Sequence, residues 1–191
     1  MTDQFEHTQY NINRKFWKLF GASIKVVSPE NQLILFAKLK ALKLREDIRL
    51  FADEAQAEEI LRIHARTILD IGTIYDVFDS ATDQKIGSVK RKGWKSILQD
   101  EWEIWDENEQ VLALMSEDSM LLALVRRFLT NLIPQKFTIA DNKAQTVANI
   151  KQNFNPFTIR LSCNVNEASP IDRRLTMVAT IMLAAIEGRQ G

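Results

Sequence analysis

The sequence predicts a mainly β protein with added α structure. We expect a closed antiparallel β-barrel of about twelve strands around an apolar C-terminal central helix, plus one amphipathic helix near residues 117–133. Short alternating segments predict the strands, and a nearly unbroken apolar run at residues 175–186 predicts the central helix. A sheet of so many strands tends to close, and a barrel that wide is not filled by its wall side chains alone. An apolar helix along the axis fills it.

The strands follow from a period of two between apolar and polar residues. In one segment Leu61, Ile63 and Ala65 alternate with Arg62 and His64. This alternation is typical of an antiparallel sheet with one buried face. Similar segments occur at residues 101–105, 111–115, 137–140, 146–151 and 157–163, and turn residues interrupt the pattern at 28–31, 79–83 and 106–109.

The C-terminal run has signals for a helix over residues 170–187. Ser169 is a suitable N-cap, Pro170 fits the first helical position, and Asp172 lies at the capping-box spacing. Gly188 is placed to close the helix. The run is apolar on every side, which predicts burial within protein. Twelve residues span about 18 Å as a helix, against about 30 Å of bilayer hydrocarbon, so no transmembrane span is expected.

A second helix is predicted near residues 117–133 by a period of 3.6 residues. Ser116 or Asp118 would cap this helix and Pro134 would end it. Its apolar positions are Leu121, Leu124, Val125, Phe128, Leu129 and Leu132. For the chain as a whole we expect a flexible N-terminal tail over residues 1–9 and a single domain over residues 10–191.

Composition narrows the classes of partner. The chain has 25 basic and 25 acidic side chains, so no overall field favours nucleic acid. The single cysteine, Cys163, excludes an internal disulfide and has the apolar neighbours of a buried thiol. The polar start has no apolar segment typical of a signal peptide. We therefore expect a cytoplasmic protein, or one peripheral to the inner face of a membrane.

Several segments together resemble the tubby-like C-terminal superfamily, and within it the phospholipid scramblase and LURP-one-related proteins. The resemblance covers roughly residues 10–187. It rests on the first strand at 10–16, the turn and strand at 27–39, the hairpins at 49–91, and the Ser-Pro-Ile-Asp entry to the last helix at 169–172. It implies a twelve-stranded barrel around a central helix. Tubby proteins bind phosphoinositides through basic surface residues, and scramblases are associated with lipid movement and calcium. Residues 164–167 hold one carboxylate where scramblases have an acidic segment, so neither scrambling nor calcium dependence is expected.

The densest basic cluster is the candidate for binding lipid phosphate. It consists of Lys90, Arg91, Lys92 and Lys95, with Trp94 between them. Basic side chains beside an aromatic ring suit head groups at an anionic membrane surface. The alternative is an ordinary solvated hairpin whose charge is cancelled across neighbouring strands by Asp100, Glu101, Glu103, Asp106 and Glu107.

Two further groups have competing interpretations. Phe16, Trp17 and Phe20 form either an exposed apolar edge that contacts a partner or membrane, or part of the core. A second basic stretch is either a binding surface or the polar face of a strand with lysines protecting an edge. It consists of Lys38, Lys40, Lys43 and Arg45.

Catalytic and metal chemistry are poorly supported. A nucleophilic pair would have to join His64 to Cys163, and nothing in the sequence brings them together. Asp76, Asp79 and Asp83 lack the order of a calcium loop, and the histidines and cysteine are too few for zinc. We expect no catalytic residue, metal or cofactor. The expected function is a non-catalytic module that binds anionic phospholipid head groups. The alternatives are a protein-interaction scaffold and an enzyme with a site at a barrel end.

Overall fold

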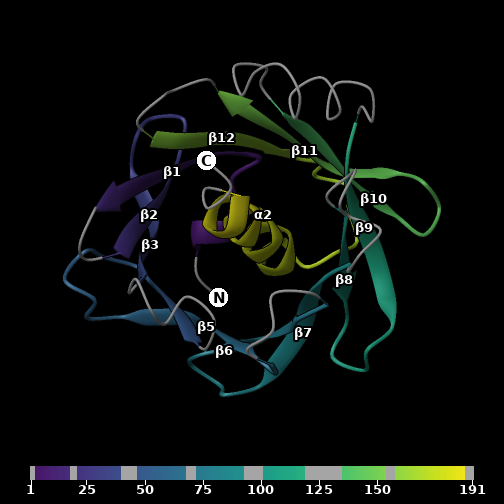
Figure 1. Cartoon of the computed structure of the whole chain (residues 1–191), viewed down its shortest axis with the longest axis horizontal. Coiled ribbons are helices and arrows are strands. Elements are labelled where there is room, and N and C mark those ends of the chain that lie inside the picture. The colour runs from purple at the N-terminus through teal and green to yellow at the C-terminus, as the bar shows by residue number, and fades with distance from the viewer. Residues whose placement is uncertain are drawn as a thin grey trace.

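Twelve antiparallel strands form a closed barrel around one helix (Figure 1). The computed structural model describes residues 3–17, 21–39, 47–67, 72–92, 101–118, 135–153 and 158–187. Each strand pairs with its neighbours in the chain, and β1 pairs with β12 to close the wall. The predicted fold class is therefore confirmed: the protein is mostly β, with an apolar C-terminal helix inside a barrel.

The strand bounds agree with the predicted order of elements. A short 3-10 helix, η1 (Asp3–Phe5), precedes the barrel. The strands are β1 (Gln9–Trp17), β2 (Gly21–Val27), β3 (Leu33–Leu39), β4 (Asp47–Phe51), β5 (Glu59–Ala65), β6 (Ile74–Asp79), β7 (Lys85–Arg91), β8 (Glu101–Trp105), β9 (Val111–Glu117), β10 (Lys136–Asp141), β11 (Thr146–Asn153) and β12 (Thr158–Val165). The helix inside the barrel is α2 (Arg173–Glu187).

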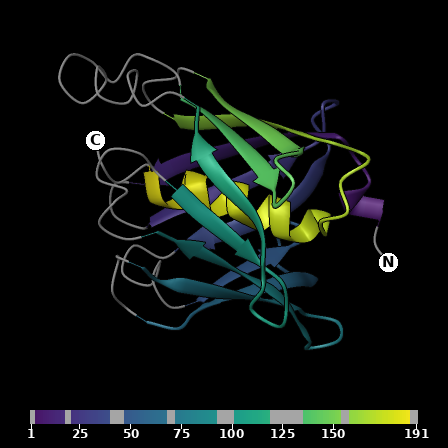
Figure 2. The same ribbon diagram turned by 90° about the vertical axis from the view of Figure 1, so that its right-hand side faces the viewer.

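The central helix is buried on every side, as its apolar run predicts. Leu175, Val178, Ile181, Met182 and Ala185 are each at most 1% exposed. Figure 2 shows α2 running along the barrel axis between the two ends. Among the described residues, no helix is long and apolar enough to cross a membrane.

The start of this helix differs from the predicted one. α2 begins at Arg173, and the carboxylate of Asp172 accepts a hydrogen bond of 2.8 Å from the backbone N–H of Arg174. Asp172 is therefore the N-cap. Ser169 instead accepts from the N–H of Ile171 in the turn before the helix, and Pro170 lies outside the first turn. The prediction of Gly188 as the closing residue falls outside the described residues.

Arg14 donates hydrogen bonds to the backbone at the C-terminal end of α2. This side chain lies on β1, points into the barrel and is 2% exposed. Its guanidinium donates to the carbonyl oxygens of Ala184 and Ala185, each at 2.7 Å. The last carbonyls of a helix have no partner within it and carry its negative pole. A buried cation from the first strand therefore caps the last helix.

The two ends of the barrel differ in what forms them. The "turn end" consists of the hairpin turns 28–32, 52–58, 80–84, 106–110 and 142–145, with the link 166–172 into α2. The helix begins at this end and ends at the opposite one (Figure 2). At the turn end the guanidinium of Arg173 donates to the carbonyl oxygens of Phe5 and Glu6, which fixes η1 against the barrel.

Two predictions fall on segments that the structure covers in part. In the predicted amphipathic helix near 117–133, Glu117 is the last residue of β9, and residues 119–134 lie outside the described residues. In the predicted tail, residues 3–5 form η1 and Gln9 belongs to β1. The flexibility of residues 1–9 stays a prediction.

Candidate functional site

The strand alternation divides the predicted basic cluster between the two sides of the wall. Lys90 and Arg91 are the last two residues of β7, and Lys92 follows them. Lys90 lies outside, opposite Glu103 of β8. Arg91 lies two residues after the fully buried Val89 and therefore on the same, inner side of the wall. Its Cζ lies 5.8 Å from the centroid of the buried Trp102 ring. The cluster therefore presents two outward lysines among its described residues, while Lys95 lies outside them.

Carboxylates of β8 neutralise both outward lysines. The Nζ of Lys90 lies 3.7 Å from a carboxylate oxygen of Glu103 and 4.8 Å from the centroid of the Trp105 ring. The Nζ of Lys92 lies 3.4 Å from Glu101 and 3.6 Å from Glu103. These contacts match the alternative in which the charge cancels across strands, and they lower the field that this hairpin offers to a phosphate.

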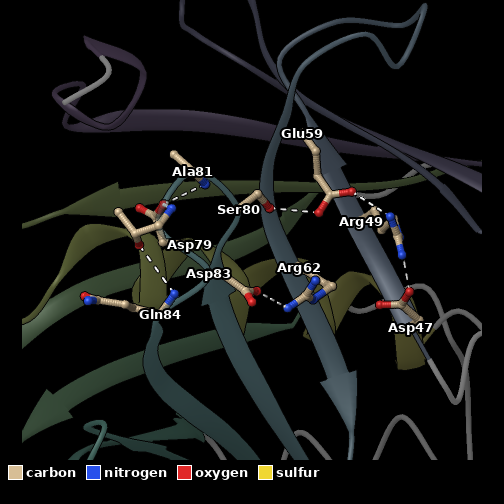
Figure 3. A network of polar contacts seen from close by, with 10 residues as sticks. Asp47, Arg49, Glu59, Arg62, Asp79, Ser80, Ala81, Asp83 and Gln84 are labelled. Atoms are coloured by element: carbon tan, nitrogen blue, oxygen red, sulfur yellow. Dashed lines mark hydrogen bonds and ion pairs between the residues drawn. The ribbon is translucent and has the colours of Figure 1, made fainter.

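Cationic side chains on the outer face of β4 to β6 are also paired with carboxylates. Figure 3 shows Arg49 between two carboxylates, with nitrogen–oxygen distances of 3.1 Å to Asp47 and 3.0 Å to Glu59. Arg62 pairs with Asp83 at 2.6 Å. On this side of the barrel, cations and anions lie together.

A denser network surrounds Asp76, the least exposed carboxylate of these pairs. Arg66 approaches it to 2.7 Å and Lys85 to 3.0 Å, and both cations also pair with Glu109. The hydroxyl of Ser88 donates to Asp76 at 2.8 Å. Burial alone would raise the pKa of Asp76, but the hydrogen bonds from Arg66, Ser88 and Lys85 outweigh it and hold this pKa well below its usual range.

The opposite side of the barrel carries exposed cations that form no ion pairs with the described residues. We call five of them the basic rim: Lys15, Lys38, Lys136, Lys151 and Arg160. All five are exposed, and none forms an ion pair with any residue that the structure describes. They lie on β1, β3, β10, β11 and β12, near the strand ends farthest from the turn end. Across the six strands from β10 to β3, Asp141 is the one carboxylate, and it belongs to the turn end.

The turn end has the opposite charge. Its turns and link carry ten carboxylates and one lysine, Lys143, which leaves nine negative charges. The acidic residues are Glu30, Asp53, Glu54, Glu58, Asp83, Asp106, Glu107, Glu109, Glu167 and Asp172. Because the whole chain has equal numbers of basic and acidic side chains, the rest of it carries nine positive charges. Four of the ten carboxylates are paired with cations of the strands or of α2: Glu54, Asp83, Glu109 and Asp172. The other six form no ion pair with a described residue, so the neutral composition conceals a charge separation between the two ends.

The basic rim was missed from the sequence because its members are far apart in the chain. Only Lys38 belongs to a predicted basic stretch, and the other members of that stretch, Lys40, Lys43 and Arg45, lie outside the described residues. Since the barrel is closed, Lys38 does not protect an open sheet edge. The signal available in the sequence was the alternation of inward and outward positions, because each rim residue lies next to a buried residue on its own strand.

The predicted apolar contact surface lies at the ends of β1 and β2. The backbones of Phe16 and Trp17 pair with Ala22 and Gly21, but their side chains and the whole of Phe20 lie outside the described residues. Their role in partner contact stays a prediction.

Cys163 is unsuited to nucleophilic chemistry. It is fully buried, and burial raises the pKa of its thiol to about 11, so the thiol stays protonated at neutral pH. The hydroxyl of Thr180 on α2 lies 3.7 Å from its sulfur. His64 is exposed on β5, whereas Cys163 faces the helix from β12. The described residues also contain no group of three or more His, Cys, Asp or Glu side chains placed to hold a metal.

Comparison with known proteins identifies the family. The sequence model of the LURP-one-related family matches residues 33–184, which covers β3 to β12 and most of α2. No curated protein and no solved structure matches the chain. The match and the twelve-stranded barrel around a central helix agree with the tubby-like resemblance. This protein belongs to the LURP-one-related family.

Proposed function

We propose that this protein is a non-catalytic binding module that binds anionic phospholipid head groups at the cytosolic face of a membrane. The observation that carries this proposal is the charge separation, with six carboxylates at the turn end and the five cations of the basic rim at the other end, none of which forms an ion pair with a described residue. Membership in a family of tubby-like barrels supports a binding role. An anionic leaflet attracts each nearby Lys or Arg by about 1 kcal/mol, so a few exposed cations give measurable binding.

The predicted cluster is one candidate for the contact. Lys90 and Lys92 face outward with the Trp105 ring beside Lys90, an arrangement that suits the boundary between water and lipid. Their pairing with Glu101 and Glu103 limits what they add, because a phosphate must compete with these carboxylates. We propose Lys90, Arg91, Lys92 and Lys95 as contributors to lipid binding rather than as a complete site.

Co-sedimentation with vesicles tests the function. Wild-type protein should sediment with vesicles of phosphatidylcholine and phosphatidylserine and stay in solution with phosphatidylcholine alone. Binding should weaken between about 0.01 M and 0.15 M salt, because the Debye length falls from about 30 Å to about 8 Å. Replacing Lys90, Lys92 and Lys95 with Ser should lower binding while changing the free energy of unfolding by less than about 1 kcal/mol. Arg91 is kept in this variant, because its guanidinium packs against the buried Trp102 ring.

A wild-type protein that ignores anionic vesicles at every salt concentration would disprove the proposal. The next hypothesis would then be a protein partner that contacts Phe16, Trp17 and Phe20. A pull-down with and without the Trp17→Ser substitution would test that alternative.

A further inference from the structure

We infer that the barrel docks end-on to the anionic lipid surface through the basic rim, with the C-terminal end of α2 toward the membrane and the turn end toward solvent. This inference rests on the proposed function and assigns its main contact to a surface other than the Lys90 cluster. The five side chains are Lys15, Lys38, Lys136, Lys151 and Arg160, all exposed and without ion pairs in the described part of the chain.

The closest positive charges of the rim face each other across one pair of strands. Lys136 of β10 lies directly opposite Lys151 of β11 in the register. Like charges in this position destabilise a sheet. On the other side of Lys136, Asp118 follows β9 at the opposite position, and its backbone N–H donates to the carbonyl oxygen of Lys136. The carboxylate of Asp118 accepts a hydrogen bond of 2.7 Å from the hydroxyl of Thr138 and forms no ion pair with a described lysine. On the other side of β11, Lys151 lies opposite Ser162, which is neutral. Phosphate groups bound here would remove the repulsion.

The remaining cations continue around the same end of the barrel. Arg160 of β12 lies opposite Asn153 and Asn13, and Lys15 of β1 lies opposite Ser23. Ser23 in turn lies opposite Lys38 of β3. The rim therefore spans five strand steps, about 24 Å at ~4.8 Å per step, with neutral polar residues between the charges.

The curvature of the wall decides the orientation. Five steps out of twelve carry the rim around nearly half of the circumference, so a flat membrane against the side of the barrel could reach only some of its members. All five lie near strand ends at one end of the barrel. A plane across that end therefore faces the strand ends that carry all five.

The rest of the charge distribution favours the same orientation. The six turn-end carboxylates without ion pairs would be repelled by an anionic surface and lie farthest from it when the barrel stands on its rim. End-on docking also turns the negative pole of α2 toward the lipid. The guanidinium of Arg14 lies on that pole, 2.7 Å from the carbonyl oxygens of Ala184 and Ala185, and offsets it.

Two triple variants with equal charge change provide the test. The rim variant carries Lys15→Ser, Lys136→Ser and Lys151→Ser. The matched control carries Lys25→Ser, Arg49→Ser and Arg62→Ser, which remove cations paired with Glu54, Glu59 and Asp83. At about fivefold per unpaired lysine, the rim variant should bind phosphatidylserine vesicles on the order of a hundredfold more weakly than wild type. The control should lose less than about tenfold, because its three cations are already paired with carboxylates.

The outcomes separate this inference from the proposed function. Wild-type protein that binds no anionic vesicle defeats the proposed function. If wild-type protein binds and the two variants lose equal affinity, the inference about the basic rim is wrong and the proposed function stands. Two other results defeat membrane docking here: rim-dependent binding to heparin but not to vesicles, or rim-dependent self-association at low salt through the acidic turn end of a second copy. Thermal melting of each variant confirms that it folds.

A fluorophore reports the orientation directly. Since Cys163 is buried, the substitutions Thr82→Cys in a hairpin turn and Asn153→Cys at the end of β11 each supply a reactive thiol. Vesicles with a quencher on their head groups should quench the label at position 153 and leave the label at position 82 bright. Equal quenching of the two labels would exclude end-on docking.

Discussion

Replacing Arg14 should uncouple the central helix from the barrel wall. The substitution Arg14→Met keeps an unbranched chain of similar length but removes the donors that satisfy Ala184 and Ala185. Both carbonyls would then lie without their charged partner in a region where the side chain of Arg14 is 2% exposed. The helix would also lose a cation at its negative pole.

The magnitude follows from these contacts. A hydrogen bond to a charged group contributes about 1.5–3 kcal/mol, so two give about 3–6 kcal/mol. Removing the guanidinium also relieves its own desolvation, which places the expected loss near the lower value, about 3 kcal/mol. For a chain of this length, 1 kcal/mol lowers the melting temperature by about 2–4 °C, so Arg14→Met should melt about 6–12 °C below wild type.

Urea denaturation at equilibrium, followed by far-ultraviolet circular dichroism, measures this loss. Lys15→Met is the matched control, because the neighbouring side chain is exposed on the same strand and forms no ion pair with any described residue. Arg14→Lys keeps the charge with a single donor group and should lie between wild type and Arg14→Met. If Arg14→Met and Lys15→Met unfold at the same urea concentration with the same slope, Arg14 does not hold the helix.

Two further predictions concern the core and the surface network. Ala179→Glu or Ile181→Asp should abolish soluble expression, since both sites are 0% exposed and would bury an unpaired charge. Leu114→Asp, at a site 43% exposed, is the control that should express normally, and a monomeric Ile181→Asp with unchanged melting would show that the helix is not central. Asp76→Asn should destabilise the protein at pH 7 and somewhat less near pH 3. The pKa of Asp76 is lowered on folding, so its contribution is complete above about pH 4 and declines gradually as pH falls below that value. Equal differences in the free energy of unfolding at the two pH values would contradict this account.

The central helix was predictable because its signal is local and redundant. Ten apolar residues among the twelve at positions 175–186 can be interpreted without knowledge of a partner, and the burial of Val178 and Ile181 follows. The exact start was not predictable, because Ser169 and Asp172 both satisfy the rules for an N-cap. The choice depends on the link before the helix, where the N–H of Ser169 bonds to the carbonyl oxygen of Asn166 and continues the turn.

The charged surface clusters were less predictable, because closure of the barrel brings together residues that are far apart in the sequence. Lys90 and Arg91 are adjacent in sequence, but a strand turns adjacent side chains to opposite sides, so sequence density overstated that cluster. Lys15 and Arg160 lie on the first and last strands, which become neighbours only when β1 pairs with β12. Arg14 could have been found by parity, because it shares the inward positions of Tyr10 and Ile12.

The place of the helix in chain order has a consequence for synthesis. Arg14 and its partner Ala184 are 170 residues apart, and translation at about 5–20 residues per second separates their appearance by roughly 10–30 s. For most of that interval the nascent chain lacks β12, which closes the barrel by pairing with β1, and α2, which fills its interior. Unpaired edges and an exposed apolar inner surface are the features that promote aggregation. We expect ribosome-associated chaperones to occupy this chain until its final helix emerges, and a codon change that slows the last stretch should lower the soluble yield without altering the folded protein.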